Sequence, residues 1–245
     1  ISKLKKITPN IILVRPQLSE NIGMTARVMD NFGLSKLSIV NPRDGWPNKK
    51  AETSAKHAKK IIDKAKIYSS LDNAILKYDL VIATSNRKRF LTKKSYNNFK
   101  IFKKKIVNFK NIAILFGPEN SGLSNKDLRL ANFIFTIPTA NSNKSLNLSH
   151  SVSIISYELF NLNHDLIKNN KNQNIYSNKV DKSELMIFIN SLINDLDFKG
   201  FFKPLEKKES MIDNIYSIYN KIDLTKKELR MLWGMHKKLK KQPKS

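Results

Sequence analysis

The chain has 245 residues, 40% of them apolar, which is enough for one large domain or for one domain with a small addition. It contains no cysteine, which excludes disulfides, thiolate nucleophiles and cysteine-ligated zinc and fits a reducing cytoplasm. The formal net charge of +25 favours polyanionic partners such as nucleic acid or acidic lipid. Part of this charge has an alternative source, because a composition rich in Lys, Asn and Ile is also typical of an AT-rich genome.

The first apolar run of the chain is short. It covers residues 11–14 and ends at Arg15 and Pro16, which is too short for the apolar region of a signal peptide or for a membrane span. We therefore expect a soluble, cytoplasmic protein with no membrane partner. Because the sequence begins with Ile1 rather than Met, we also expect it to lack part of the translated product.

Short apolar runs alternate with amphipathic stretches through the first two thirds of the chain. The runs typical of strands are residues 10–14, 36–40, 66–70, 79–85, 112–116 and 133–138. The stretches typical of helices are residues 20–33, 51–65, 71–77, 125–131 and 146–162. A basic segment, 87–110, interrupts the pattern. This order predicts an α/β fold with a mostly parallel sheet of about six strands and helices on both faces.

The last third of the chain has a different character. Residues 163–180 are polar, rich in Asn and weakly periodic, as expected of a linker. Three amphipathic helical segments follow, at 181–200, 207–222 and 225–241. We therefore expect a domain at 1–162 and a small helical C-terminal appendage at 181–245.

The stretch AILFGPENSGLS, residues 113–124, runs from a strand into a turn with two glycines and one carboxylate, Glu119. It matches neither the GxxxxGK[ST] phosphate loop nor the GxGxxG dinucleotide motif. Its glycines allow close backbone approach to a ligand, while Ser124 and Asn125 can cap the following helix. The turn alone is compatible with a ligand site and with a purely structural role.

Two further segments combine polar residues with helix starts. SENIGMTAR, residues 19–27, places Arg27 about two turns into a helix. Its planar guanidinium could bind a phosphate through two hydrogen bonds or simply face solvent. NKSLNLSHSVSIISYE, residues 143–158, places Ser145, Asn147 and Ser149 where they can act as caps or as site residues. His150 is a candidate base or simply a surface histidine.

Two other classes of enzyme site find no support. The four His residues of the chain show no metal-ligand spacing, so we expect no metal. The GxSxG motif of serine hydrolases is absent as well.

In this order and spacing, the three segments resemble the three sequence motifs of the SPOUT class of RNA methyltransferases, specifically its 2'-O-ribose branch. The first motif matches as Asn21-x-Gly23-x-x-x-Arg27, the second as ILFGPENSGLS and the third as SLNLSHSVSIISYE. The opening IILVRPQLSENIGMTAR, the strand end VIATSNR and the helical C-terminal part are most similar to the bacterial tRNA (cytidine/uridine-32-2'-O)-methyltransferases.

The resemblance implies a sheet whose C-terminal third is threaded into a deep trefoil knot, which is an exception to the usual absence of knots. It implies S-adenosylmethionine bound in that knot, and a homodimer whose active sites draw on both subunits. The implied cofactor-binding residues are Thr84, Ser85, Asn86, Gly117, Ile137, Ser145, Leu146, Asn147 and Leu148. The implied catalytic or substrate-binding residues are Asn21, Arg27, Glu119, Ser145 and Asn147.

The implied reaction is attack of a ribose 2'-hydroxyl on the methyl group of the cofactor. The family's proposed base falls on Arg27, but a guanidinium stays protonated in proteins, so we favour Arg27 as a grip on the phosphate beside the target, with deprotonation as a second possibility. Asn21 and Ser145 would orient Arg27 or the ribose. Glu119 can only accept hydrogen bonds when ionised, so we expect it to face Arg27, backbone N–H groups or a ribose hydroxyl.

RNA is the expected partner, because its 2'-hydroxyl is itself the nucleophile. The candidate phosphate contacts are Arg27, Arg87, Lys88, Arg89, Lys103, Lys104 and Lys105. tRNA is favoured, and two alternatives remain open: an rRNA ribose methyltransferase, and a non-catalytic RNA-binding paralogue that kept the knot. The presence of Arg27 and Asn147 favours an enzyme over the paralogue.

Overall fold

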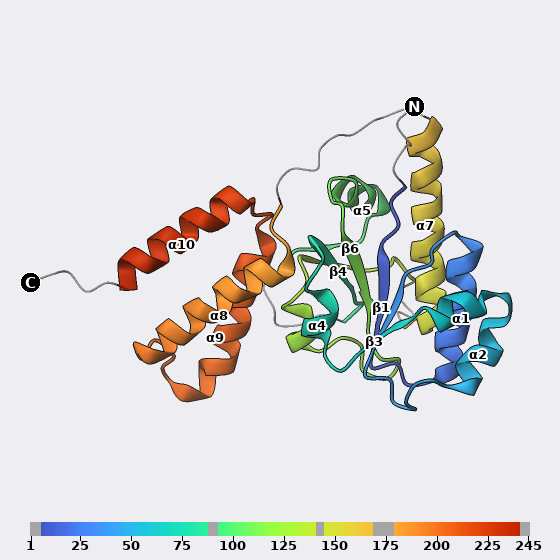
Figure 1. Cartoon of the computed structure of the whole chain (residues 1–245), viewed down its shortest axis with the longest axis horizontal. Helices are drawn as coiled ribbons and strands as arrows, with labels where there is room; N and C mark the ends of the chain where they lie inside the picture. The colour runs from blue at the N-terminus through green and yellow to red at the C-terminus, as the bar shows by residue number, and fades with distance from the viewer. Residues whose placement is uncertain (1–5, 88–92, 141–144, 169–178, 241–245) are drawn as a thin grey trace, which may run out of the picture.

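A computed structural model describes residues 6–87, 93–140, 145–168 and 179–240 of the chain. Figure 1 shows a central sheet flanked by helices, with three C-terminal helices gathered on one side of it and extending away from it. None of the helices described is long and apolar enough to cross a lipid bilayer.

The sheet has seven strands in the order β3-β2-β1-β6-β4-β7-β5, and every pairing is parallel. The strands are β1 (Asn10–Val14), β2 (Leu37–Val40), β3 (Lys66–Tyr68), β4 (Leu80–Thr84), β5 (Ser95–Tyr96), β6 (Ile112–Phe116) and β7 (Phe133–Phe135). The predicted parallel sheet is confirmed. The additional strand, β5, lies in the basic segment and has only two residues, so it leaves no apolar run in the sequence.

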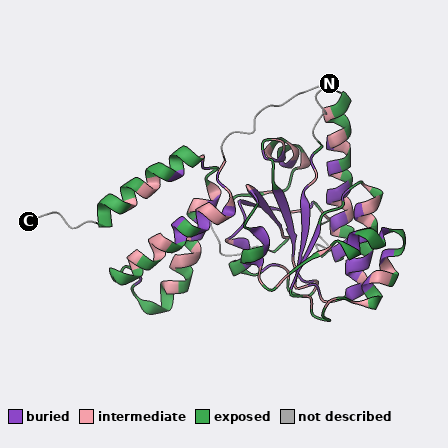
Figure 2. Ribbon diagram, viewed as in Figure 1, coloured by how far each residue is buried: buried purple, intermediate pink, exposed green. Residues whose placement is uncertain are grey.

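The sheet is buried on both faces. Along β1, Ile11 and Leu13 belong to one apolar cluster, while Ile12 and Val14 belong to another, because successive side chains of a strand point to opposite faces. Figure 2 shows the strands buried between their covering helices. This two-sided burial explains why the strands are continuous apolar runs in the sequence.

Different helices cover the two faces. On the first face lie α1 (Ser19–Asn31), α2 (Lys49–Ala55), α3 (Lys59–Asp63), α5 (Phe99–Ile106) and α7 (Leu148–Lys168). On the second face lie α4 (Leu71–Ile75), α6 (Asn125–Leu128), α8 (Lys182–Phe198), α9 (Lys208–Lys221) and α10 (Lys226–Lys240). Two short 3-10 turns, Lys56–Ala58 and Leu205–Lys207, complete the described helical elements.

Two predicted helices differ from those observed. The single helix expected at 51–65 is broken into α2, a 3-10 turn and α3, because Lys56 has a φ of 52°, outside the helical range. The helix expected to end at residue 162 continues as α7 to Lys168. The first part of the predicted linker is therefore helical, and residues 169–178 lie outside the described part of the chain.

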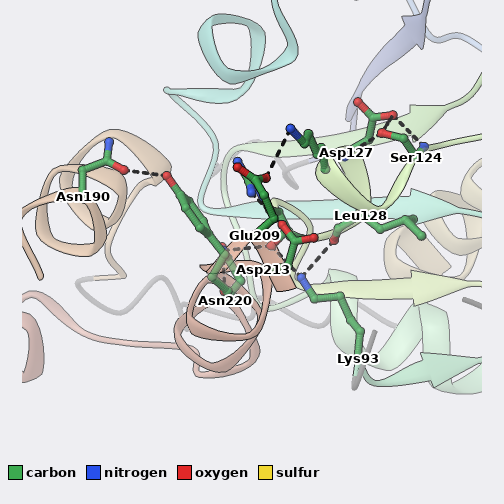
Figure 3. A network of polar contacts seen from close by, with 11 residues as sticks. Lys93, Ser124, Asp127, Leu128, Asn190, Glu209, Asp213 and Asn220 are labelled. Carbon is green, nitrogen blue, oxygen red and sulfur yellow. Dashed lines mark hydrogen bonds and ion pairs between the residues drawn. The ribbon is translucent and has the colours of Figure 1, made fainter. Parts of the chain in front are cut away.

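The predicted C-terminal helices are confirmed, and they pack on the sheet. In Figure 3, side chains of α9 lie beside those of α6. Arg129 Nη1 lies 2.6 Å from Asp213 Oδ1, and Asn220 Nδ2 donates to the Arg129 carbonyl at 3.1 Å. The first residues of α8 attach to the loop before β4, where Ser183 N donates to the Leu76 carbonyl at 3.0 Å. The knot stays a prediction with which this strand order is compatible.

Candidate active site

A cavity of about 250 Å³ opens at the carboxyl ends of β4 and β6, the edge where ligands of parallel sheets bind. We call it the carboxyl-edge pocket. Of the nine residues predicted to bind cofactor, eight line it, and the exception is Asn147. Its described lining is Thr84, Ser85, Asn86, Arg87, Phe116, Gly117, Pro118, Glu119, Gly122, Ile137, Ser145, Leu146, Leu148 and Ser151.

Hydroxyl groups fix the strand ends that form one wall of this pocket. Thr84 Oγ1 donates to the Leu115 carbonyl at 2.7 Å and so joins the end of β4 to β6. Thr136 Oγ1 donates to the Ser85 carbonyl, also at 2.7 Å, and joins the chain after β4 to the chain after β7. These two hydrogen bonds therefore join the carboxyl ends of β4, β6 and β7 to one another.

The turn at 117–122 forms another wall. Gly122 has a φ of +65°, and its N–H donates to the Pro118 carbonyl at 2.8 Å. A Cβ atom on Gly117 would lie 2.4 Å from the backbone nitrogen of Leu123, so the turn can fold back only on a glycine. The helix after the turn begins with a capping box, in which Asp127 N donates to Ser124 Oγ at 3.2 Å.

Glu119 connects this turn to the start of α1. Its Oε2 accepts from Gln17 N at 2.8 Å, and its Oε1 accepts from Leu18 N at 3.3 Å and from Asn21 Nδ2 at 2.7 Å. Helix α1 has no side-chain cap of its own, since Leu18 stands at the cap position. A carboxylate from about a hundred residues away thus supplies the negative group that a helix N-terminus favours.

Asn21 also forms a hydrogen bond with Asn147, the residue just before α7. It is buried, and its Oδ1 accepts from Asn147 Nδ2 at 3.2 Å. Asn147 Oδ1 in turn accepts from Ser149 N at 2.9 Å and from Ser149 Oγ at 2.8 Å, next to the first turn of α7. One chain of hydrogen bonds therefore joins all three sequence motifs, through Glu119, Asn21 and Asn147. The expectation that Asn21 orients Arg27 or the ribose stays a prediction.

Arg27 lies on a different side of α1 from Asn21. Its side chain is exposed, and it makes no hydrogen bond or ion pair with any residue that the structure describes. It does not line the carboxyl-edge pocket of its own chain. With a rise of about 1.5 Å per residue, it lies about 12 Å along the helix from Ser19.

The predicted RNA contacts do not lie together. Arg87 lines the carboxyl-edge pocket, and its Nη2 donates to the Asn120 carbonyl at 2.8 Å. Lys103 forms an ion pair with Glu158 at 2.6 Å. Lys104 and Lys105 belong to α5 and line a different cavity, at the amino ends of the strands. Lys88 and Arg89 lie outside the described residues.

Sequence reasoning missed several participants. Gln17 and Leu18 contribute backbone N–H groups, which carry no sequence signal. Phe116 and Pro118 belong to the second motif and line the pocket, and their place in that motif was the signal that could have found them. No group of three or more possible metal-ligating side chains occurs within the described ranges.

The model of the family described as SpoU rRNA Methylase matches residues 8–157. The chain belongs to this family. It is 40% identical over 160 residues to "tRNA (cytidine-2'-O-)-methyltransferase TrmJ" of Methanocaldococcus jannaschii, an alignment that covers 62% of this chain and 66% of that relative. It is 30% identical over 231 residues to an "uncharacterized tRNA/rRNA methyltransferase" of Haemophilus influenzae, covering 92% and 91%.

A solved structure extends the similarity of this SpoU-family chain to the C-terminal helices. The crystal structure of TrmJ from Z. mobilis ZM4 is 35% identical and superposes with a TM-score of 0.85, covering 96% of this chain and 100% of that one. The similarity therefore includes both the methylase domain and the helices that pack on its second face.

Proposed function

We propose that this protein is an S-adenosylmethionine-dependent methyltransferase that modifies a ribose 2'-hydroxyl in tRNA. Its family membership and its relative in M. jannaschii support this activity. The observation that carries the proposal is the chain of hydrogen bonds Glu119–Asn21–Asn147, which gathers the three motifs at one pocket. The target that the sequence resemblance implies is the cytidine or uridine at anticodon-loop position 32, in the cytoplasm.

The residues of the carboxyl-edge pocket fit the proposed cofactor. Ile137, Leu146 and Leu148 offer apolar surface for an adenine ring, and the hydroxyl and amide groups of Ser85 and Asn86 offer hydrogen bonds for polar parts. The tight turn at Gly117 keeps side-chain atoms away from the pocket wall. When bound, S-adenosylmethionine supplies a methyl group on a positively charged sulfur.

This chain would contribute mainly position and charge. Holding a nucleophile in line with its target can lower a barrier by about 7–11 kcal/mol in favourable cases. We assign Arg27 to the phosphate next to the target ribose, which suits an exposed guanidinium without a partner among the described residues. Ser145 and Asn147 would orient the ribose, and Glu119 would hold the walls of the site rather than act as a base.

The protein would work as a homodimer with composite sites. Large apolar side chains are exposed on adjoining α1 and α7, among them Met24, Tyr157 and Phe160, with exposed fractions of 39%, 51% and 40%. Arg27 lies one turn from Met24 on the same side of α1. An apolar surface of this kind is typical of a protein interface, and pairing through it would bring Arg27 to the pocket of the second subunit.

The proposed catalytic unit is the domain at 1–162, with the knot built from the chain around β7, and the helices at 181–245 would serve it as an RNA-binding appendage. Lys237 and Lys238, two exposed side chains in the last turn of α10, would contact RNA phosphates.

The test is a methyl-transfer assay with labelled S-adenosylmethionine and separate pools of tRNA and rRNA. We expect label in tRNA, and digestion to nucleosides should recover 2'-O-methylcytidine or 2'-O-methyluridine. Absence of label from both pools would contradict an enzymatic role. Label in rRNA alone would favour the second candidate, an rRNA ribose methyltransferase, which the family description and the name of the H. influenzae relative keep open.

A further inference from the structure

A second cavity, of about 410 Å³, lies at the opposite edge of the sheet from the carboxyl-edge pocket. It opens between α5, the edge strand β5 and the segment that follows α9, and we call it the α5 cavity. Leu80 and Phe133, the first residues of β4 and β7, form part of its lining. Figure 1 shows α5 at this amino-terminal edge of the strands.

Four lysines line the α5 cavity, Lys94, Lys104, Lys105 and Lys221, and the lining contains one acidic residue, Asp223. None of these four lysines forms an ion pair with any residue that the structure describes. Four like charges around one hollow repel one another, so their arrangement favours an anionic occupant.

The positive charge at this cavity also affects the neighbouring Lys93. Lys93 Nζ donates to the carbonyls of Leu128 and Arg129 at 2.9 and 2.7 Å. Burial, and then the positive charges of Lys182 and Lys221, lower the pKa of Lys93 to about 6. Lys221 is therefore close enough to act on Lys93 while it also lines the cavity.

The cavity also offers surface for more than a simple anion. Lys105 Nζ lies 4.9 Å from the centroid of the Tyr96 ring, and that ring meets the ring of Phe133 edge to face at 5.4 Å. Ile101 on α5 is 42% exposed at the same cavity. Cationic groups combined with aromatic and apolar surface are the usual features of sites for single-stranded nucleic acid.

We propose that the α5 cavity binds nucleotides of the RNA substrate, with phosphates on Lys94, Lys104 and Lys221 and a sugar or base against Tyr96 and Ile101. This proposal rests on the proposed function in one respect, that the partner is RNA. Strand β4 separates the cavity from the carboxyl-edge pocket, and at about 3.3 Å per residue its five residues span about 13–16 Å. The site is therefore distinct from the place of methyl transfer, and a folded RNA can reach both.

The test is the salt dependence of tRNA binding by the triple variant Lys94→Gln, Lys104→Gln, Lys221→Gln, measured by fluorescence anisotropy. Each lost phosphate contact removes about 0.7–0.9 from the slope of log K against log salt. We expect a slope smaller by about 2 and an affinity about 10- to 100-fold weaker at 0.1 M salt. The matched control is Lys49→Gln, Lys56→Gln, Lys64→Gln, which removes the same charge from exposed lysines on the α2–α3 side.

Equal slopes for the two triple variants would overturn the proposal. So would tight binding of free cytidine monophosphate that the cavity variant alone loses, if tRNA affinity stayed unchanged. Binding of S-adenosylmethionine, measured by calorimetry, checks that each variant is folded. Because RNA binding is measured without turnover, absence of methyl transfer by the unaltered protein would contradict the proposed function and leave this site to be judged by its own slope.

Discussion

The carboxyl and amino edges of the sheet differ in whether their polar side chains have partners within the protein. At the carboxyl edge, Glu119, Asn21 and Asn147 satisfy one another and the backbone, so the walls of the pocket are fixed before any ligand arrives. At the amino edge, Lys94, Lys104 and the other lysines of the α5 cavity have no ion pairs among the described residues. We infer a division of labour: a preorganised edge suits chemistry, and an edge with uncompensated charge suits affinity for a polyanion.

The largest effect should come from Arg27→Ala. In our account it removes the group that holds the phosphate beside the ribose, so the rate of methyl transfer should fall by roughly a hundredfold or more. Cofactor affinity should stay unchanged, since in our account Arg27 contacts the RNA phosphate and not the cofactor. Single-turnover kinetics and calorimetry measure the two quantities. Arg230→Ala, which changes another exposed helical arginine, is the control, and an Arg27→Ala enzyme with the unaltered rate would remove Arg27 from the mechanism.

A smaller loss is expected at the turn of the carboxyl-edge pocket. In Gly117→Ala the new Cβ would meet backbone atoms of Gly122 and Leu123 at 2.4–2.6 Å, so the turn must open and the pocket changes shape. We expect cofactor affinity to fall at least about tenfold, which is about 1.4 kcal/mol. Titration calorimetry measures this directly.

The control for that variant is Gly234→Ala, in α10. A Cβ there meets nothing within 4 Å, and alanine favours a helix over glycine by about 0.5–1 kcal/mol. This change should leave cofactor affinity unaltered and raise the melting temperature slightly. If both variants bound the cofactor as tightly as the original chain, the turn would not shape the site.

Glu119→Gln tests the hydrogen bonds by which Glu119 holds the turn to the start of α1. The substitution replaces one acceptor oxygen with an N–H donor that faces other donors, at a cost of about 1–3 kcal/mol in the free energy of unfolding. For a chain of this size the melting temperature should fall by about 2–4 °C per kcal/mol. Glu206→Gln, at an exposed carboxylate, is the control. A melting temperature equal to that of the control would mean that Glu119 does not hold α1 to the turn.

The last prediction concerns a buried charge near the amino edge of the sheet. Burial lowers the pKa of Lys182 from its ordinary value of 10.5 to about 7, while Asp223 acts in the opposite direction. Between about pH 7 and 10.5 the unfolded chain binds this proton and the folded chain does not. The free energy of unfolding should therefore rise with pH in that window, by up to about 1.4 kcal/mol per unit.

Replacement by Lys182→Met should flatten this rise. Urea unfolding at pH 7, 8 and 9 gives the slopes, with Lys199→Met, at an exposed position, as the control. Parallel curves for the Lys182→Met variant and the unaltered protein would show that Lys182 stays charged in the fold, balanced by Asn220, to which it donates a hydrogen bond.

The sequence was sufficient for the sheet and for the motifs, because both leave local signals. Continuous apolar runs identified β1, β4 and β6, and turns after them identified the ends that carry the pocket. Strand β5 and helix α5 were missed, since two residues form no pattern and the lysines of α5 hide its one apolar face.

Contacts between distant residues could not be predicted in the same way. Glu119 was correctly expected to face donors, and backbone N–H groups were among the partners considered, but nothing in the sequence indicates that Gln17, Leu18 and Asn21 supply them. Lys104 and Lys105 were grouped with Arg87 because all are basic. Their separation to opposite edges follows from the direction of α5 against the strands, which only the folded chain displays.

The most direct test of the central claim uses two tRNA transcripts that differ in one atom. One carries ribose at nucleotide 32, the other 2'-deoxyribose, and each is incubated with the protein and labelled S-adenosylmethionine. Our account predicts one methyl group per molecule in the first transcript and none in the second. Equal labelling of both transcripts would contradict methylation of that 2'-hydroxyl.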